Sequence, residues 1–135
     1  MTVIGFVRHG NTDWNIEQRA QGHSHNPLNE RGFMQAEAIG KRLAQENWDV
    51  LISSDLLRAK QTAKIISKYT GLDIIYDQRI REISRGTIEG TIESERVKKW
   101  GKNWHHQDYG EETIEALRQR GVDFVKDVLT TYENK

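Results

Sequence analysis

The N-terminal stretch, residues 3–12, constrains the fold most, because a short apolar run ends abruptly in Arg8, His9 and Gly10. Val, Ile and Phe in such a run are typical of a strand buried on both faces. Glycine then lets the backbone turn where a side chain would obstruct it. The pattern predicts Arg8 and His9 at the carboxyl end of a strand, where open α/β sheets build their sites. The alternative is a strand that ends in two solvated polar residues.

Composition limits the partners. The chain of 135 residues fits one domain, and its 20 basic and 20 acidic side chains cancel. The chain therefore has no net positive charge that would attract nucleic acid or an anionic membrane. Any anion-binding site must be formed by a local group of basic side chains. The absence of cysteine excludes disulfides and thiolate chemistry and fits a reducing compartment. The longest apolar runs are far too short to span a membrane, and the N-terminal residues lack the pattern of a signal peptide. We therefore expect a cytoplasmic protein.

A second buried strand is predicted at residues 49–54, and a third strand, short and β-branched, at residues 72–76. A helix follows Pro27, with Asn29 as its N-cap. A second helix is expected to be capped by Ser54 or Asp55 and to stop at Gly71.

An apolar stripe over residues 114–132 predicts a final helix, and residues 13–26 and 78–95 are expected to be mostly loop. The alternation of strands and helices predicts an α/β sandwich.

Arg58 is a second chemical signal. It lies in the first turn of the predicted second helix, where the helix dipole disfavours a cation by roughly 0.3–1 kcal/mol. A cation fits there if an anion sits between it and the helix N-terminus. Arg8 and Arg58 could then converge on one phosphate, which the planar guanidinium suits. The alternative is an exposed, solvated arginine.

Ordered blocks across the chain resemble the histidine phosphatase superfamily, also called the phosphoglycerate mutase-like family. They include Arg-His-Gly-Asn-Thr and Ser-Asp-Leu-Leu-Arg, and they fall in residues 7–15, 26–32, 53–63, 80–90 and 109–113. The resemblance implies a three-layer α/β/α sandwich with a mostly parallel sheet, formed as one domain over residues 1–135.

The resemblance also implies roles. His9 would be a nucleophile that forms a phosphohistidine, and Glu82 would give a proton to the leaving oxygen. Burial of Glu82 could supply the raised pKa that such an acid needs. The alternative for Glu82 is a surface ion pair with Arg81 or Arg85. The implied substrate-binding residues, which would act without a metal or cofactor, are Arg8, Asn15, Gln21, Gly22 and Arg58.

Other histidines and arginines are expected to be structural or solvated. The histidine pairs at 23 and 25 and at 105 and 106 lack the spacing of a zinc helix, so no metal site is predicted. Arg118 and Arg120 are most simply placed on a solvated face.

The end of the sequence departs from the family pattern. A second catalytic histidine is expected in a His-Gly turn after a further strand, and the chain stops at Lys135 before either. We therefore expect an incomplete domain, either a truncated family member or a fragment of a longer protein. The missing strand would expose a sheet edge and invite pairing into a homo-oligomer.

Three functions stay open at this stage. The first is a metal-independent phosphatase that acts on small phosphorylated metabolites, so that the expected ligand is such a metabolite or inorganic phosphate. The second is a phosphoglycerate mutase-type isomerase. The third is a catalytically impaired phosphate-binding remnant. The short connection between Gly90 and Tyr109 favours the phosphatase branch, because mutases carry longer insertions there.

Overall fold

A computed structural model describes residues 1–135, the whole chain. Its longer helices are α2 (Glu30–Leu43), α3 (Leu57–Thr70), α4 (Glu93–Trp100) and α5 (Ile114–Thr131). The strands are β1 (Leu51–Ser53) and β2 (Ile74–Tyr76). Shorter turns of helix are α1 (Asp13–Glu17), η1 (Gln78–Ile80), η2 (Gly86–Ile88) and η3 (Trp104–His106). None of the helices is long and apolar enough to cross a membrane.

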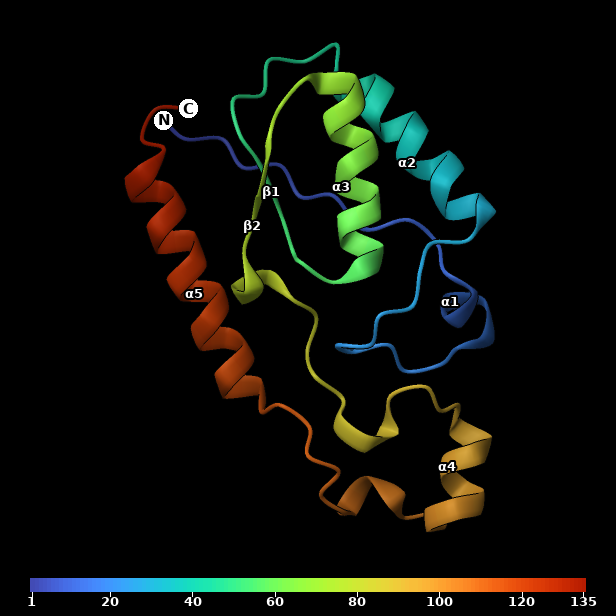
Figure 1. The fold of residues 1–135 in the computed structure, drawn as a ribbon. Coiled ribbons are helices and arrows are strands. Elements are labelled where there is room, and N and C mark those ends of the chain that lie inside the picture. The colour runs from blue at the N-terminus through green and yellow to red at the C-terminus, as the bar shows by residue number, and fades with distance from the viewer.

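The strands and helices form layers. β1 and β2 are parallel, with Leu51 opposite Ile74 and Ser53 opposite Tyr76, and α3 connects them. Helices α2 and α3 pack together on one side of the strands, and α5 runs along the other side (Figure 1). The predicted α/β sandwich is therefore confirmed, although only the strands at 49–54 and 72–76 form, each shorter than expected.

The N-terminal strand prediction is wrong for this structure. Residues 1–11 contain no strand, and Phe6 is 84% exposed, so the apolar run is not buried on both faces. The only backbone hydrogen bond from residues 3–10 to other backbone joins Val3 N–H to the carbonyl of Lys135. A strand requires a hydrogen-bonded neighbour, and β1 pairs only with β2.

Helix caps follow the sequence in part. Asn29 caps α2 and accepts a hydrogen bond from Gly32 N–H at 2.9 Å, as predicted. Gly71 ends α3 at φ 76°, also as predicted. The N-cap of α3, however, is Leu56 rather than Ser54 or Asp55, and it has no side-chain cap. Asp55 instead pairs with Arg81.

The buried apolar side chains lie in three places, one of which is α5 with Phe124 and Val128. Leu28, Ala36, Leu56, Ala63 and Ile66 are buried around α2 and α3. A separate cluster of Ile88, Trp104 and Tyr109 lies beneath α4. The predicted loop over 78–95 is interrupted by η1, η2 and the start of α4, so it is more ordered than expected.

Candidate active site

All of the predicted site residues line one cleft of about 520 Å³. The cleft lies where the loop after residue 12, the start of α3 and the segment after η1 meet. Its wall includes the predicted nucleophile, acid and substrate-binding residues, which are His9, Glu82, Arg8, Asn15, Gln21, Gly22 and Arg58.

His9 is held in one tautomer. Its Nδ1 lies 2.7 Å from the carbonyl oxygen of Gly10, which can only accept a hydrogen bond, so Nδ1 carries the proton. Nε2 therefore keeps a free lone pair. Burial lowers the pKa of His9, the Gly10 hydrogen bond raises it, and the cations Arg58 and Arg8 lower it further. The net direction is downward, which favours the neutral imidazole that a nucleophile needs.

Gly10 connects the backbone next to His9 to the packed helices α2 and α3. Its N–H donates to Thr62 Oγ1 at 3.0 Å, and that hydroxyl donates to the Arg58 carbonyl at 2.9 Å. A Cβ on Gly10 would lie 2.4 Å from the Gly32 carbonyl oxygen, so the backbone approach requires glycine. This confirms that a side chain at Gly10 would obstruct the chain. Thr62 lies in the motif block at residues 53–63 but was not assigned a site role from the sequence.

Arg58 is buried rather than solvated, with only 2% of its surface exposed. Its Nη2 donates to the Gly22 carbonyl at 2.6 Å, and Nη1 donates to the Ser24 carbonyl at 3.1 Å. No carboxylate lies within 4.0 Å of its guanidinium. Burial lowers the pKa of Arg58, and the more distant Glu82 and Glu89 partly oppose the shift. The cation on the cleft wall is therefore not neutralised by a direct partner.

Asn15 and Gln21 are oriented by Thr12, which is fully buried. Thr12 N–H donates to Asn15 Oδ1 at 3.0 Å, and the Thr12 hydroxyl donates to Gln21 Oε1 at 2.7 Å. The hydroxyl also accepts from Asn15 N–H and caps α1. Both amide oxygens are thus engaged, while the two side-chain NH₂ groups have no partner in the protein. They are donors on the cleft wall suited to phosphoryl oxygens.

Glu82 lies on the cleft wall but is exposed to solvent. The expected burial of this acid is therefore absent. Its Oε1 accepts a hydrogen bond from Ile83 N–H at 2.8 Å. The alternative ion pairs are also wrong, because Arg81 pairs with Asp55 and Arg85 lies 3.1 Å from Glu111.

Glu89 fixes the loop at Gly22. Its Oε2 accepts hydrogen bonds from Arg85 N–H at 2.8 Å and from His23 N–H at 3.1 Å. Gly22 has φ 49°, and a Cβ there would lie 2.2 Å from the same carboxylate oxygen. The loop that presents Gly22 therefore depends on Glu89, which belongs to a recognised block but was not assigned a site role.

Further arginines complete the cleft wall. Arg19 is paired with Glu17 and Glu95, and Arg96 with Glu93. Arg85 Nε is buried and has no hydrogen-bond partner, although Glu111 is close. The cleft is thus lined by cations, with Glu82 as its only carboxylate. No group of three or more His, Cys, Asp or Glu side chains could hold a metal ion.

Sequence comparisons agree on the family. Residues 4–135 match the model of the histidine phosphatase superfamily (branch 1). The chain is 38% identical over 135 residues to "Uncharacterized phosphatase PhoE" of Bacillus subtilis, covering 100% of this chain and 68% of that protein. It is 40% identical over 107 residues to "Probable phosphoglycerate mutase GpmB" of Escherichia coli, covering 79% of this chain and 49% of that protein.

Solved structures resemble it as well. A mycobacterial glucosyl-3-phosphoglycerate phosphatase complexed with VO3 superimposes with a TM-score of 0.82 at 29% identity. That match covers 92% of this chain and 63% of the mycobacterial chain. YhfR of Bacillus stearothermophilus superimposes with a TM-score of 0.82 at 30% identity. That match covers 94% of this chain and 67% of the YhfR chain. The chain thus spans about half of the mutase-named relative and less than two thirds of the mycobacterial enzyme. With its matching motifs, fold and cleft, it belongs to the histidine phosphatase superfamily.

Proposed function

We propose that the chain transfers the phosphoryl group of small phosphomonoesters to His9 and then to water. One observation carries this proposal: His9 with a free Nε2, the unpaired Arg58 cation and the Glu82 carboxyl line the same cleft. Catalysis of phosphoryl transfer rests mainly on positioning and on stabilising negative charge. Arg8, Arg58 and the amide donors of Asn15 and Gln21 would supply that stabilisation without a metal.

In the first step the Nε2 lone pair of His9 attacks phosphorus, and the bond from phosphorus to the ester oxygen breaks. The Glu82 carboxyl gives its proton to the departing oxygen, so an alcohol leaves. The Gly10 carbonyl stabilises the positive charge on the ring through the Nδ1 proton. The product is a phosphohistidine and a Glu82 carboxylate.

In the second step water attacks the phosphorus, and the nitrogen–phosphorus bond breaks. The Glu82 carboxylate takes a proton from the attacking water. Inorganic phosphate leaves, and His9 regains its Nε2 lone pair. Over the two steps the phosphomonoester and water become an alcohol and inorganic phosphate, and both His9 and Glu82 return to their starting protonation states.

A mutase is the second candidate, because the similarity to the mutase-named relative is of the same order as that to PhoE. A mutase would return the phosphoryl group to another hydroxyl rather than to water. Incubation with 3-phosphoglycerate separates the two: release of inorganic phosphate supports the phosphatase, and 2-phosphoglycerate supports the mutase.

The test is covalent labelling by ³²P-labelled p-nitrophenyl phosphate, quenched in alkali because phosphohistidine is stable in base and labile in acid. We expect label on the wild type and on His25→Gln, whose histidine is exposed outside the cleft. His9→Gln should carry none. Label retained in His9→Gln would refute the assignment. Absence of label and turnover, with thermal stabilisation by phosphate that Arg58→Gln abolishes, would identify a phosphate-binding protein instead.

A further inference from the structure

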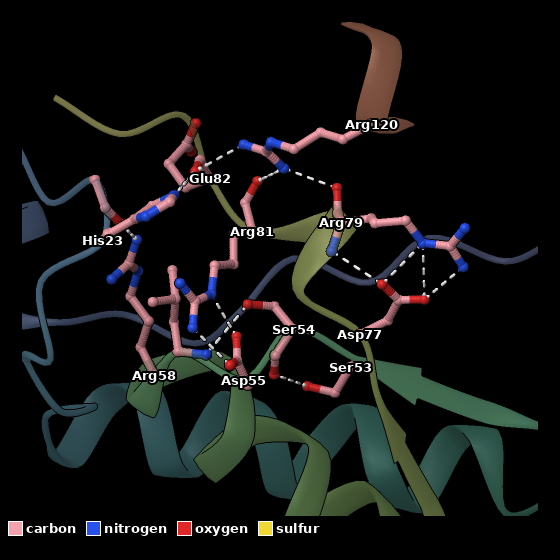
Figure 2. Close-up of polar contacts among 12 residues, drawn as sticks. His23, Ser53, Ser54, Asp55, Arg58, Asp77, Arg79, Arg81, Glu82 and Arg120 are labelled. Atoms are coloured by element: carbon pink, nitrogen blue, oxygen red, sulfur yellow. Dashed lines mark hydrogen bonds and ion pairs between the residues drawn. The ribbon is translucent and has the colours of Figure 1, made fainter. Parts of the chain in front are cut away.

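Arg120 of α5 donates hydrogen bonds to the backbone of the segment that carries Glu82. Arg120 was expected on a solvated face, but only 17% of its side chain is exposed. Its Nη1 donates to the carbonyls of Arg79 at 2.7 Å and Arg81 at 2.5 Å, and its Nη2 donates to the Glu82 carbonyl at 3.0 Å. Figure 2 shows these carbonyls turned toward the guanidinium. One side chain thus binds the backbone on both sides of residue 80 and at the predicted acid itself.

The Arg120 guanidinium is itself fixed by Glu112. Its Nε and Nη2 donate to the two Glu112 oxygens at 2.7 and 2.8 Å, a bidentate pair that sets the plane of the fork. Glu112 also accepts from Ser84 N–H at 3.2 Å, and its own N–H donates to the Ser84 carbonyl. Residues 79–84 are therefore held by Arg120 on one side and by Glu112 at their end.

The same segment contacts the loop that presents Gly22 on the cleft wall. Nε2 of His23 lies 2.8 Å from the Glu82 carbonyl oxygen, which Arg120 also binds. His23 follows Gly22, whose carbonyl accepts from Arg58. Figure 2 shows His23 between Glu82 and Arg58. The position of Glu82 relative to Arg58 is consequently set through a continuous series of hydrogen bonds that begins on α5.

Backbone restraint is important for Glu82 because burial does not immobilise its exposed side chain. The neighbouring side chains of Arg79 and Arg81 are bound to Asp77 and Asp55, away from the cleft. A displacement of about 1 Å in a reacting group can cost roughly 100-fold in rate. We propose that Arg120 is a positioning residue that places the Glu82 carboxyl for proton transfer to the leaving oxygen. This inference rests on the function proposed above.

The test uses the leaving group as its readout. An alkyl phosphate needs a proton on its departing oxygen, whereas p-nitrophenolate leaves without one. Arg120→Lys keeps a cation beside Glu112 but loses the fork that reaches the carbonyls. We expect phosphohistidine formation from an alkyl phosphate to slow by about 10-fold or more, and formation from p-nitrophenyl phosphate to change by about twofold at most. KM should stay unchanged, because Arg8 and Arg58 are untouched.

Arg118→Lys is the matched control, since Arg118 is exposed on the same helix and makes no ion pair or side-chain hydrogen bond. It should leave both substrates unaffected. Equal slowing of both substrates by Arg120→Lys, or no slowing, would overturn the positioning role. Circular dichroism shows whether Arg120→Lys folds. If it does not, Glu112→Gln takes its place, because this variant loosens the same guanidinium, and its phosphohistidine formation is measured with the same two substrates.

Glu82→Gln separates this inference from the proposed function. It should show the same leaving-group dependence more strongly, because general acids contribute about 10²–10⁴-fold. If Glu82→Gln shows no such dependence, the role of Glu82 as the acid fails and the positioning role fails with it. If Glu82→Gln shows it and Arg120→Lys does not, only the positioning role is lost.

Discussion

Arg58, which is buried, and Arg120, which is half-buried, both hold segments of the cleft wall by hydrogen bonds to backbone carbonyls, but their charges are partnered differently. Arg58 lies in the first turn of α3 and Arg120 lies within α5. Each guanidinium donates to backbone carbonyls of a segment that lines the cleft. Arg120 also forms a bidentate pair with Glu112. Arg58 has no carboxylate partner, and its contacts are carbonyl and amide oxygens.

Under the proposed function, this difference distinguishes the charge of Arg120, which holds backbone, from the charge of Arg58, which would bind the phosphoryl group. Neutral carbonyls orient a guanidinium without cancelling its charge, so Arg58 stays available to an anion at the expense of desolvation. Burial accordingly lowers the pKa of Arg58. In the other pair, the Arg120 hydrogen bonds lower the pKa of Glu112 to about 2. Arg120 is thus neutralised, and its fork serves to hold backbone.

The largest expected effect is on function at Arg58. Arg58→Gln should lower phosphatase activity by about 10²–10³-fold, because a preorganised donor to the transferring group is lost. Thermal stabilisation by phosphate or vanadate should disappear, while anion-free stability should change little, since an uncompensated buried charge is removed. The control is Arg42→Gln, on the exposed side of α2. Anion stabilisation that survives in Arg58→Gln would contradict the comparison.

The next effect is on stability at Arg120. Arg120→Gln should lower the free energy of unfolding by about 2–3 kcal/mol in urea titrations, because it leaves Glu112 without its cation and several carbonyls without donors. Arg120→Gln with Glu112→Gln should recover part of that loss. Arg118→Gln should stay within about 0.5 kcal/mol of wild type. A larger loss of anion-free stability in Arg58→Gln than in Arg120→Gln would reverse the assignment of the two roles.

The same two arginines show what a sequence can predict. Arg58 was placed correctly because a local signal, a cation in the first turn of a helix, coincides with a motif block. Asn29 and Gly71 were likewise predictable, since caps depend on the few residues around them. The motif spacing also brought the predicted site residues to one cleft.

Arg120 gave no such signal, because its partners are carbonyls up to 41 positions away that only tertiary folding brings near. The strand expected over residues 3–7 failed for the same reason. Its apolar pattern favours extended chain, yet a strand also depends on a hydrogen-bonded neighbour, which the pattern does not reveal. The exposure of Glu82 also depends on which segments pack around it in the folded chain, and the local sequence does not reveal this. Local rules therefore predicted the helix ends at Asn29 and Gly71 and the motif positions, whereas long-range contacts decided the N-terminal backbone, the Arg120 contacts and the exposure of Glu82.

A smaller effect concerns the acid sensitivity of the Arg120 region. The pKa of Glu112 falls from 4.5 to about 2 on folding, so the unfolded chain binds more protons between these pH values. The resulting stability is complete above pH 4.5 and is lost as the pH falls toward 2. Wild type should therefore lose about 1–2 kcal/mol more than Glu112→Gln between pH 6 and pH 3, measured by urea unfolding. Parallel pH profiles for the two proteins would show that Arg120 does not stabilise the Glu112 carboxylate.

The smallest effect is on the His9 titration. Removing a nearby cation makes the protonated imidazole less unfavourable, so Arg58→Gln and Arg8→Gln should each raise the pKa of His9. The rise should be larger for Arg58→Gln, whose cation has the stronger influence of the two. Glu82→Gln should move the pKa the opposite way, since its carboxylate favours the charged ring. NMR titration of the His9 ring protons measures all three. Arg120→Gln, which removes the Arg120 charge, should leave the His9 pKa unchanged. If it shifted the His9 pKa as much as Arg58→Gln, the charge of Arg120 would reach the cleft, and the distinction between a charge that binds substrate and one that holds backbone would fail.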